Sequence, residues 1–207
     1  MNFLELFSGS AIFSRTAALR GHSTKTLDFE AVYSPDICKD ILDFKPSDLP
    51  DGWIPDVIWA SPECACFSVA SIGTHWWEYS PKTEEAKQAI RFVKTTVNVI
   101  NDLKPKRFFV ENPRGMLRKL DLVPGRLQTV SYCRYGDTRM KPTDIWTNSS
   151  WVGRPMCNNG NPDHQSAPRG SRTGTQGISG KFERAVLPLE LCTEIIMHLE
   201  SELQHTS

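Results

Sequence analysis

A cysteine that could act as a nucleophile follows a short apolar run of the sequence. Cys64 lies in the segment Ser61-Pro62-Glu63-Cys64-Ala65-Cys66-Phe67-Ser68, and the run before it, 56–60, predicts a buried strand. Enzymes of the α/β class place their sites at the carboxyl ends of such strands. A thiolate there can attack an electrophilic carbon if nearby groups favour its charged form. A buried structural cysteine is the alternative.

A carboxylic acid holds the corresponding place after another predicted strand. Residues 107–110 form a mostly apolar run, and Glu111, Asn112 and Pro113 come directly after it. A carboxyl group at the end of a buried strand is partly desolvated, which raises its pKa and lets it donate a proton. An acid beside a proline is also common in ordinary turns, so the residue types leave both interpretations open.

A third candidate is a ligand-binding turn near the start of the sequence. The apolar run 3–7 stops at Ser8-Gly9-Ser10, where small residues and the free N–H groups of a following helix let a ligand approach the backbone. Asp28 lies 19 residues after Gly9, at the end of the next predicted strand. An acid there can accept both ribose hydroxyls of a nucleoside-type cofactor. Asp40 could add a contact to an adenine ring. An ordinary tight turn is the alternative.

These candidates need a sheet that brings them together. Apolar runs predict strands at 3–7, 24–29, 56–60, 107–110, 127–133 and 144–147, and helices at 12–19 and 188–203. Strands that alternate with helices predict an α/β fold with a largely parallel sheet.

A longer helix is predicted after the cysteine segment. We expect Ser80 to cap it and Pro81 to take its first position, with Glu84 and Glu85 in the first turn. Apolar residues then recur every three or four positions, on one face of a helix: Ala86, Ile90, Val93, Val97 and Ile100.

Composition indicates one soluble domain and a small lobe. The chain has 207 residues, of which 39% are hydrophobic and 23% charged, enough to bury a proper core. Residues 148–181 contain few apolar residues and much Asn, Gly, Ser, Pro and Arg. We predict that they form a loop-rich lobe, with 1–147 and 182–207 as the sheet domain.

The net charge of zero hides an uneven distribution. Residues 101–184 carry 15 Lys and Arg against 7 Asp and Glu, whereas 1–100 carry 9 against 13. The basic segment suits contact with phosphates, or is merely a solvated face. We find no membrane span and no secretion signal. Six scattered cysteines indicate reduced thiols and a cytoplasmic protein, in a bacterium or a phage-infected host. We expect a monomer or a weak dimer.

The joint order of these motifs resembles the DNA (cytosine-5) methyltransferases, in particular small phage or prophage members. Pro62, Cys64, Phe67 and Ser68 stand where that family has Pro-Cys-x-x-Phe-Ser. The segment 4–9 resembles the family's first motif, and Glu111-Asn112 resembles its Glu-Asn-Val motif. Residues 185–188 are a faint echo of its last motif. The resemblance covers residues 3–148 well and the remainder poorly.

The resemblance implies a Rossmann-like S-adenosylmethionine-dependent methyltransferase sheet with helices on both faces and a small target-recognition lobe, 148–181. It implies methyl transfer from S-adenosylmethionine to carbon 5 of cytosine in DNA. Cys64 would add covalently to carbon 6, Glu111 would assist at N3, and Asn112 would hold the loop or touch the base. The residues that it places around the methyl donor are Phe7, Ser8, Gly9, Ser10, Asp28, Asp40 and Pro62.

Departures from the family pattern concern the nucleophile and the substrate. Glu63 replaces a proline and opposes a neighbouring thiolate, and Ala65 replaces a glutamine. The expected Gln-x-Arg-x-Arg motif reads Arg139-Met140-Lys141-Pro142-Thr143. Our candidate substrate-binding residues are Ser68, Arg139, Lys141, Arg154, Arg169 and Arg172.

The segments on either side of the substrate carry two further expectations. We expect residues 65–80 to close over a base flipped out of the duplex. Cys157 and His164 have only six residues between them, but two candidate ligands do not make a zinc site, so we predict no metal.

Two alternatives stay open at this point. The same chemistry could act on RNA or on a free nucleotide, as the zero net charge and the small lobe suggest. The chain could also be a catalytically silent relative that binds nucleic acid or regulates a partner, which Glu63 and the altered 139–143 segment suggest.

Overall fold

The short apolar runs of the sequence form one mixed sheet. The computed structural model describes residues 1–158, 160–171 and 174–204, and its 7-stranded sheet has the order β3-β2-β1-β4-β7-β9-β8. The strands are β1 Asn2–Leu6, β2 Ser23–Asp28, β3 Ile37–Cys38, β4 Val57–Ala60, β7 Arg107–Pro113, β8 Arg126–Ser131 and β9 Pro142–Thr147. The predicted α/β fold is confirmed, and the short β3 is an addition to it.

The direction of the strands decides where a site can form. β3, β2, β1, β4 and β7 are parallel neighbours, so their carboxyl ends lie along one edge of the sheet. β9 runs antiparallel to both β7 and β8. The polar segments after β1, β2, β3 and β4 therefore meet at the same edge, which is where ligands bind in sheets of this type.

The strand predicted at 107–110 ends too early, and the one predicted at 127–133 ends too late, since residues 132 and 133 lie in η4 (Tyr132–Tyr135). The strand expected at 107–110 is longer, because β9 pairs with β7 as far as Pro113. The partner on the other side, β4, pairs with β7 only as far as Val110. Glu111 and Asn112 therefore lie in regular strand geometry beyond the end of β4, rather than in a turn.

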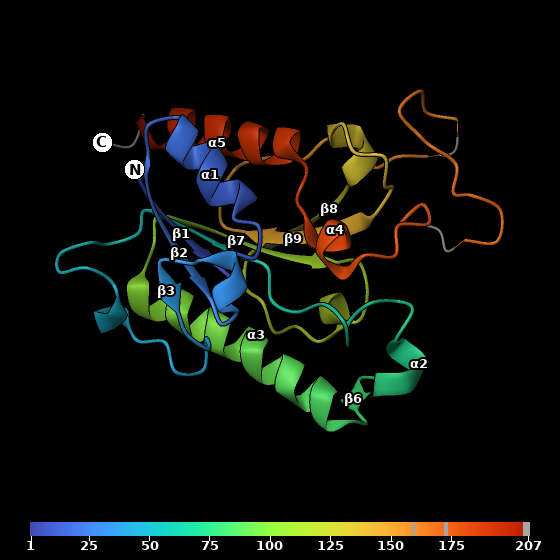
Figure 1. Cartoon of the computed structure of the whole chain (residues 1–207), viewed down its shortest axis with the longest axis horizontal. Coiled ribbons are helices and arrows are strands. Elements are labelled where there is room, and N and C mark those ends of the chain that lie inside the picture. Colours follow the sequence, from blue (N-terminus) through green and yellow to red (C-terminus); the bar gives the residue numbers. More distant parts are fainter. Residues whose placement is uncertain (159, 172–173, 205–207) are drawn as a thin grey trace.

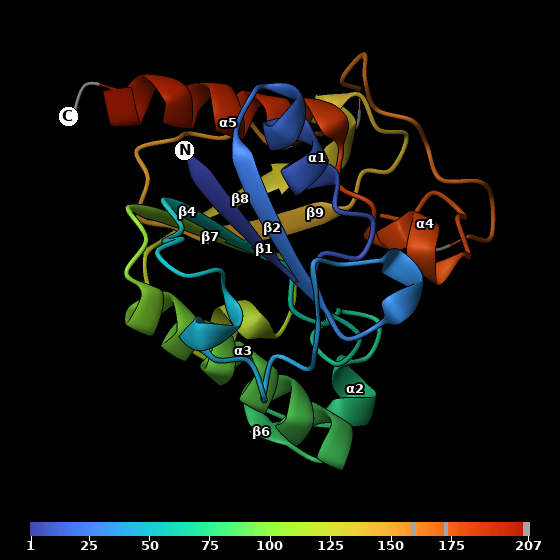
Figure 2. The ribbon, with the colours of Figure 1, turned by 60° about the vertical axis from the view of Figure 1, so that its left-hand side comes forward.

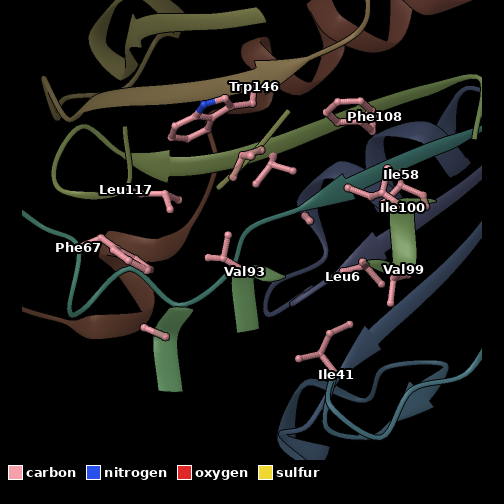
Figure 3. Close-up of a cluster of buried hydrophobic side chains, with 14 of the residues drawn as sticks. Leu6, Ile41, Ile58, Phe67, Val93, Val99, Ile100, Phe108, Leu117 and Trp146 are labelled. Carbon is pink, nitrogen blue, oxygen red and sulfur yellow. The ribbon is translucent and has the colours of Figure 1, made fainter. Parts of the chain in front are cut away.

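Helices cover both faces of the sheet (Figure 1). α1 Ile12–Leu19 and α5 Leu189–Gln204 lie side by side on one face, and α3 Glu84–Leu103 crosses the other, as Figure 2 also shows. Because side chains alternate along a strand, Leu4 and Leu6 pack toward α3 while Phe3 packs toward α1 and α5. Figure 3 shows Leu6 and Val93 within the α3-side core.

The start of α3 differs from our expectation. Thr83, not Ser80, caps the helix, and its side-chain oxygen accepts a hydrogen bond of 3.2 Å from the Ala86 N–H. Ser80 and Pro81 form β6 (Ser80–Pro81), which pairs with β5 (Trp76–Trp77) in a small hairpin after the short helix α2 (Ile72–His75). The hairpin thus contains the two residues that we had assigned to the start of the helix.

The segment after β9 has little regular structure. Between β9 and α4 (Lys181–Ala185), the described residues contain neither helix nor strand. Trp151 and Cys157 at its beginning are buried. Among the described residues, no helix combines the length and the apolar character needed to cross a membrane. The remaining short elements are the 3-10 helices η1 Ala31–Tyr33, η2 Pro46–Asp48, η3 Leu117–Lys119 and η4 Tyr132–Tyr135.

Candidate active site

Cys64 lies in the segment that follows β4, and Glu111 lies in the part of β7 that extends past the end of β4. Ala60, the last residue of β4, pairs with Val110 of β7, so the segment that carries Cys64 begins beside Glu111. The Cys64 side chain is half-buried, whereas Glu111 is only 5% exposed. The negative charge of Glu111 acts on the Cys64 thiol. The sheet thus brings together a thiol and a carboxyl group that are far apart in the sequence.

The segment that carries Cys64 is fixed to β7 by Asn112. The fully buried Asn112 donates a hydrogen bond of 2.9 Å from Nδ2 to the carbonyl oxygen of Pro62. Farther along, the Met116 N–H donates a hydrogen bond of 2.7 Å to the Phe67 carbonyl. A Cβ added at Gly115 would lie 2.1 Å from that carbonyl oxygen, so only glycine permits this approach.

Glu111 has one direct side-chain partner that the sequence analysis missed. The hydroxyl of Tyr132, in η4, donates a hydrogen bond of 3.0 Å to Glu111 Oε1, and both side chains are buried. The Lys141 ammonium lies 4.6 Å from the centroid of the Tyr132 ring, and the Arg139 guanidinium carbon 5.3 Å from it. The altered 139–143 segment therefore supports Glu111 through Tyr132. A polar aromatic residue at the end of a predicted strand was the only available signal.

The electrostatic surroundings of Cys64 oppose its thiolate in the free protein. Burial is the largest cause that raises the pKa of the Cys64 thiol, and the charges of Glu111 and Glu63 raise it further. The positive charge of Lys141 acts in the opposite direction. Cys64 is therefore protonated at neutral pH, and a reaction through its thiolate needs a change in these surroundings when substrate binds.

The segment after Cys64 has a buried anchor and an exposed tip. Trp76 stacks on Phe67, with ring centroids 5.8 Å apart, and its indole N–H donates a 2.7 Å hydrogen bond to the Cys66 carbonyl. The neighbouring Trp77 is 71% exposed. Ser68 is a predicted substrate-binding residue. Its hydroxyl oxygen lies 3.0 Å from that of Ser71, and its backbone forms a β-bridge with Gly115.

The predicted cofactor turn lies at the same edge of the sheet, after β1. Phe7 has φ 58°, an uncommon value for a residue other than glycine, and Gly9 has φ 46°. A Cβ added at Gly9 would meet no heavy atom within 4 Å, so the backbone there is open to a ligand. Ser8 is buried and Ser10 is half-buried.

Asp28 ends β2 and closes this turn. Its Oδ2 accepts a hydrogen bond of 2.8 Å from the Gly9 N–H, and its Oδ1 one of 2.9 Å from the Glu30 N–H. Each carboxylate oxygen has a second lone pair, so two hydroxyl donors can still bind. Asp40 is half-buried beyond β3 and accepts a 2.8 Å hydrogen bond from the Leu42 N–H. Pro62 is buried after β4.

The basic candidates for substrate contact have varied surroundings. Arg139 is 3% exposed, and it binds Asp137 and the carbonyls of Glu183 and Val186. Lys141 donates a 2.9 Å hydrogen bond to the Arg184 carbonyl. Both side chains thereby hold α4 and the residues after it beside the sheet edge at which the parallel strands end. Their contact with a substrate stays a prediction.

The three candidate arginines of the predicted lobe, 148–181, are Arg154, Arg169 and Arg172. The Arg154 guanidinium forms ion pairs of 2.9 Å with Glu190 and 2.8 Å with Glu194, on α5. These partners occupy its donors within the protein. Arg169 is exposed, and Arg172 lies outside the described residues. Of the two that the structure describes, Arg169 has its side chain in solvent, where a phosphate can reach it.

Comparison with known proteins gives one related sequence. A protein of Frog virus 3 (isolate Goorha), named "Probable DNA (cytosine-5)-methyltransferase", is 29% identical to this chain over 220 residues. The match covers 93% of this chain and 100% of that protein. The chain is therefore similar in sequence, over nearly its whole length, to a protein with that name. The resemblance inferred from the motifs is confirmed, although no family model matches the chain.

Solved structures of similar fold belong to methyltransferases. One is named a "putative DNA modification methyltransferase encoded within prophage" of E. coli, with TM-score 0.52, 16% identity and 71% of this chain covered. Another is the Entamoeba histolytica methyltransferase EhMeth, with TM-score 0.50, 14% identity and 71% of this chain covered. This chain covers 46% and 52% of those two chains, about half of each. The expected Rossmann-like methyltransferase fold is confirmed.

Proposed function

We propose that the chain transfers a methyl group from S-adenosylmethionine to carbon 5 of cytosine in DNA. The convergence of Cys64 and Glu111 at the ends of β4 and β7 is the observation that carries this proposal. The name of the Frog virus 3 relative supports the same reaction. Residues 1–147 and 182–207 would form the catalytic domain and 148–181 the target-recognition lobe.

The residues at the carboxyl ends of β1 and β2 are suited to bind the methyl donor. The open backbone at Gly9 admits a ligand, and the buried Asp28 carboxylate retains lone pairs for two ribose hydroxyls. Phe7 offers an aromatic face, and Asp40 offers an acceptor toward the adenine. S-Adenosylmethionine bound there supplies the electrophilic methyl group. Ser8, Ser10 and Pro62 would complete the walls of this site.

Carbon 5 of cytosine is a poor nucleophile until a thiolate adds to carbon 6. In the proposed first step Cys64 releases its thiol proton to water, a bond forms between Sγ and carbon 6, and the electron pair of the ring double bond moves toward N3. Glu111 donates a proton to N3, which keeps the ring neutral. Carbon 5 then carries enamine-like electron density and takes up the methyl group. Methyl transfer from the sulfonium leaves a neutral thioether, and the N3 proton returns to Glu111. A base from the solvent then removes the proton at carbon 5 while the Sγ–carbon 6 bond breaks, which restores the aromatic ring and releases Cys64 as a thiolate.

Tyr132 is a positioning residue in this scheme. Its hydroxyl holds Glu111 Oε1, so that the carboxyl group can present its other oxygen to the base. Protonated Glu111 would also remove the negative charge that raises the pKa of Cys64. Formation of the thiolate and protonation of the base are thereby coupled, because both depend on the charge of Glu111.

A base in DNA reaches this site only if it is flipped out of the duplex. Residues 65–80 stand directly after Cys64, and their exposed Trp77 is available to fill the vacated space. Basic residues of 148–181 would contact phosphates, with the exposed Arg169 the clearest candidate.

The decisive experiment uses tritiated S-adenosylmethionine and plasmid DNA that lacks cytosine methylation. After digestion to nucleosides, we expect label in 5-methylcytosine with the wild-type protein and none with Cys64→Ser. Label in transfer RNA or a free nucleotide, but not in DNA, would identify a different substrate. Donor binding without turnover on any of them would contradict the enzyme proposal and favour a regulatory relative.

The covalent step needs a test of its own. In DNA that contains 5-fluorocytosine, the fluorine at carbon 5 cannot leave as a proton, so the final elimination is blocked. We expect a denaturant-stable complex of protein and DNA, with the adduct on the peptide that contains Cys64. A complex that maps to Cys66 instead would show that the nucleophile is misassigned.

A further inference from the structure

Three side chains that commonly bind zinc converge outside the candidate active site. They are Cys133 in η4, and Cys157 and His164 in the segment after β9. Their ligand atoms all lie within 4.8 Å of one another, and Cys157 Sγ is 3.2 Å from His164 Nδ1. Ligands at about 2.0–2.3 Å from a tetrahedral zinc ion are separated by roughly 3.5–4 Å. The cluster is therefore close to the size of a zinc site.

The sequence alone concealed the third ligand. Cys157 and His164 are seven positions apart in the sequence. Cys133 comes close to them because the segment after β9 lies beside the end of β8 and η4. The Ser131 hydroxyl accepts a 3.1 Å hydrogen bond from the Cys157 N–H and fixes this cysteine next to the end of β8. Two ligands from the sequence thus become three in the fold.

The surroundings hold the three side chains in place. Cys133 and Cys157 are each 2% exposed, and His164 is half-buried. The His164 N–H donates a 3.0 Å hydrogen bond to the Asn161 carbonyl, in a turn that also hydrogen-bonds the Asn158 N–H to the Asn161 side chain. An ion pair of 2.6 Å between Arg134 and Asp163 joins the same two parts of the chain. The site is therefore largely formed before any ion binds.

The described residues of 158–180 lack the regular structure and the apolar side chains that would stabilise them. Residues 158–180 have neither helix nor strand within their described part, and few of them are apolar. A short segment that cannot bury a core of its own is commonly stabilised by a metal or a disulfide. Here a metal suits the donors better, since a disulfide between Cys133 and Cys157 would leave the adjacent imidazole without a role.

We propose that Cys133, Cys157 and His164 bind one zinc ion, which ties the segment after β9 to η4. Two thiolates and an imidazole select zinc over magnesium or calcium, which prefer oxygen ligands. The fourth tetrahedral position is left for a water molecule. In this proposal the ion joins two parts of the chain. Cys133 directly follows Tyr132, so the ion would also hold in place the residue that contacts Glu111.

The test begins with the full-length protein, purified under reducing conditions without chelators or a polyhistidine tag. We expect about one zinc ion per chain by elemental analysis. Cobalt(II) added after removal of zinc should give the intense thiolate-to-cobalt absorption of a site with cysteine ligands. Added zinc should raise the Tm of the metal-free protein.

The variants Cys157→Ser and His164→Ala separate this site from other thiols. Both should lose stoichiometric zinc and the cobalt spectrum, while Cys38→Ser, at an exposed cysteine elsewhere, should retain them. Because a ligand variant could fail to fold, circular dichroism checks the folding of each variant beside its metal analysis. The zinc content of the wild-type protein does not depend on the variants. A folded wild-type protein that binds neither zinc nor cobalt overturns the proposal. So does a Cys133–Cys157 disulfide found by mass spectrometry in protein without zinc.

Discussion

The side-chain amide of Asn112 donates a 2.9 Å hydrogen bond to the main-chain carbonyl of Pro62, 50 residues earlier in the sequence. This bond joins the end of β7 to the segment that carries Cys64. The other amide atom, Oδ1, is buried and has no hydrogen-bond partner within the part of the chain that the structure describes. One residue therefore fixes the spacing between the thiol and Glu111, and it keeps an acceptor free for a substrate or a rearranged loop.

Loss of the nucleophile should separate binding from chemistry. We expect Cys64→Ser to lower methyl transfer by more than about a thousandfold, because an alcohol is far less nucleophilic than a thiolate. Binding of S-adenosylmethionine should stay near normal, since Cys64 lies outside the donor residues. Calorimetric titration with the donor measures this. Loss of both properties would show that Cys64 is needed for the fold or for the cofactor site.

Gly115 should be sensitive to a single added methyl group. In Gly115→Ala the new Cβ would lie 2.1 Å from the Phe67 carbonyl oxygen, so the segment after Cys64 must move. We expect turnover to fall by about tenfold or more, because small displacements of reacting groups are costly. Donor binding should persist, since Gly9 and Asp28 lie on other strand ends. Unchanged turnover would mean that this segment adjusts freely during the reaction.

Tyr132→Phe removes the hydroxyl that holds Glu111 and keeps the ring on which Lys141 packs. A hydrogen bond to a charged group contributes about 1.5–3 kcal/mol, so we expect turnover to fall by roughly tenfold to a hundredfold. As a positioning residue, Tyr132 should affect kcat more than KM. A uniform loss of folded protein, with unchanged kinetics per folded molecule, would point to a purely structural role.

Lys141→Met should move the pH dependence of the reaction. The Lys141 charge lowers the pKa of Cys64, so its removal raises that pKa further and reduces the thiolate fraction at neutral pH. Because the thiolate is the reactive form, the rising limb of activity should shift to higher pH, with about tenfold less thiolate per pKa unit. Lys141→Arg keeps the charge and should restore the original profile. Identical profiles for all three proteins would contradict a role in tuning Cys64.

Glu5 should make stability depend on pH. Burial in β1 raises the pKa of Glu5 to about 7, although hydrogen bonds from Ser14 act in the opposite direction. The folded protein therefore holds this proton more tightly than the unfolded chain. The stabilising effect is complete below the unfolded pKa near 4.5 and is lost as pH rises through about 7, a change of roughly 3 kcal/mol.

Glu5→Gln tests this by removing the titration with little change in shape. We expect the Tm of the wild-type protein to fall relative to that of the variant between pH 5 and about 8. Urea denaturation at the same pH values gives the matching free energies of unfolding. A constant difference between the two proteins over this range would show that Glu5 does not titrate there.

The sequence alone determined the elements and the kinds of residues at the site. The local periodicity predicted α1 at 12–19, α5 and most strands, because these depend on apolar patterns within a few residues. The Cys64 and Glu111 motifs could be found because each follows an apolar run directly. The cap of α3 was misplaced, since the pairing of Ser80 and Pro81 with Trp76 and Trp77 competes with helix formation there.

Only the tertiary structure decided which distant residues meet. Tyr132 contacts Glu111, Gly115 approaches Phe67, and Cys133 joins Cys157 through the order and direction of β7, β9 and β8. The antiparallel pairing of β9 also carried β7 past its predicted end. Such contacts are made across strands and between segments, and their free energy depends on the packing of the whole sheet. No local pattern in the sequence records that packing.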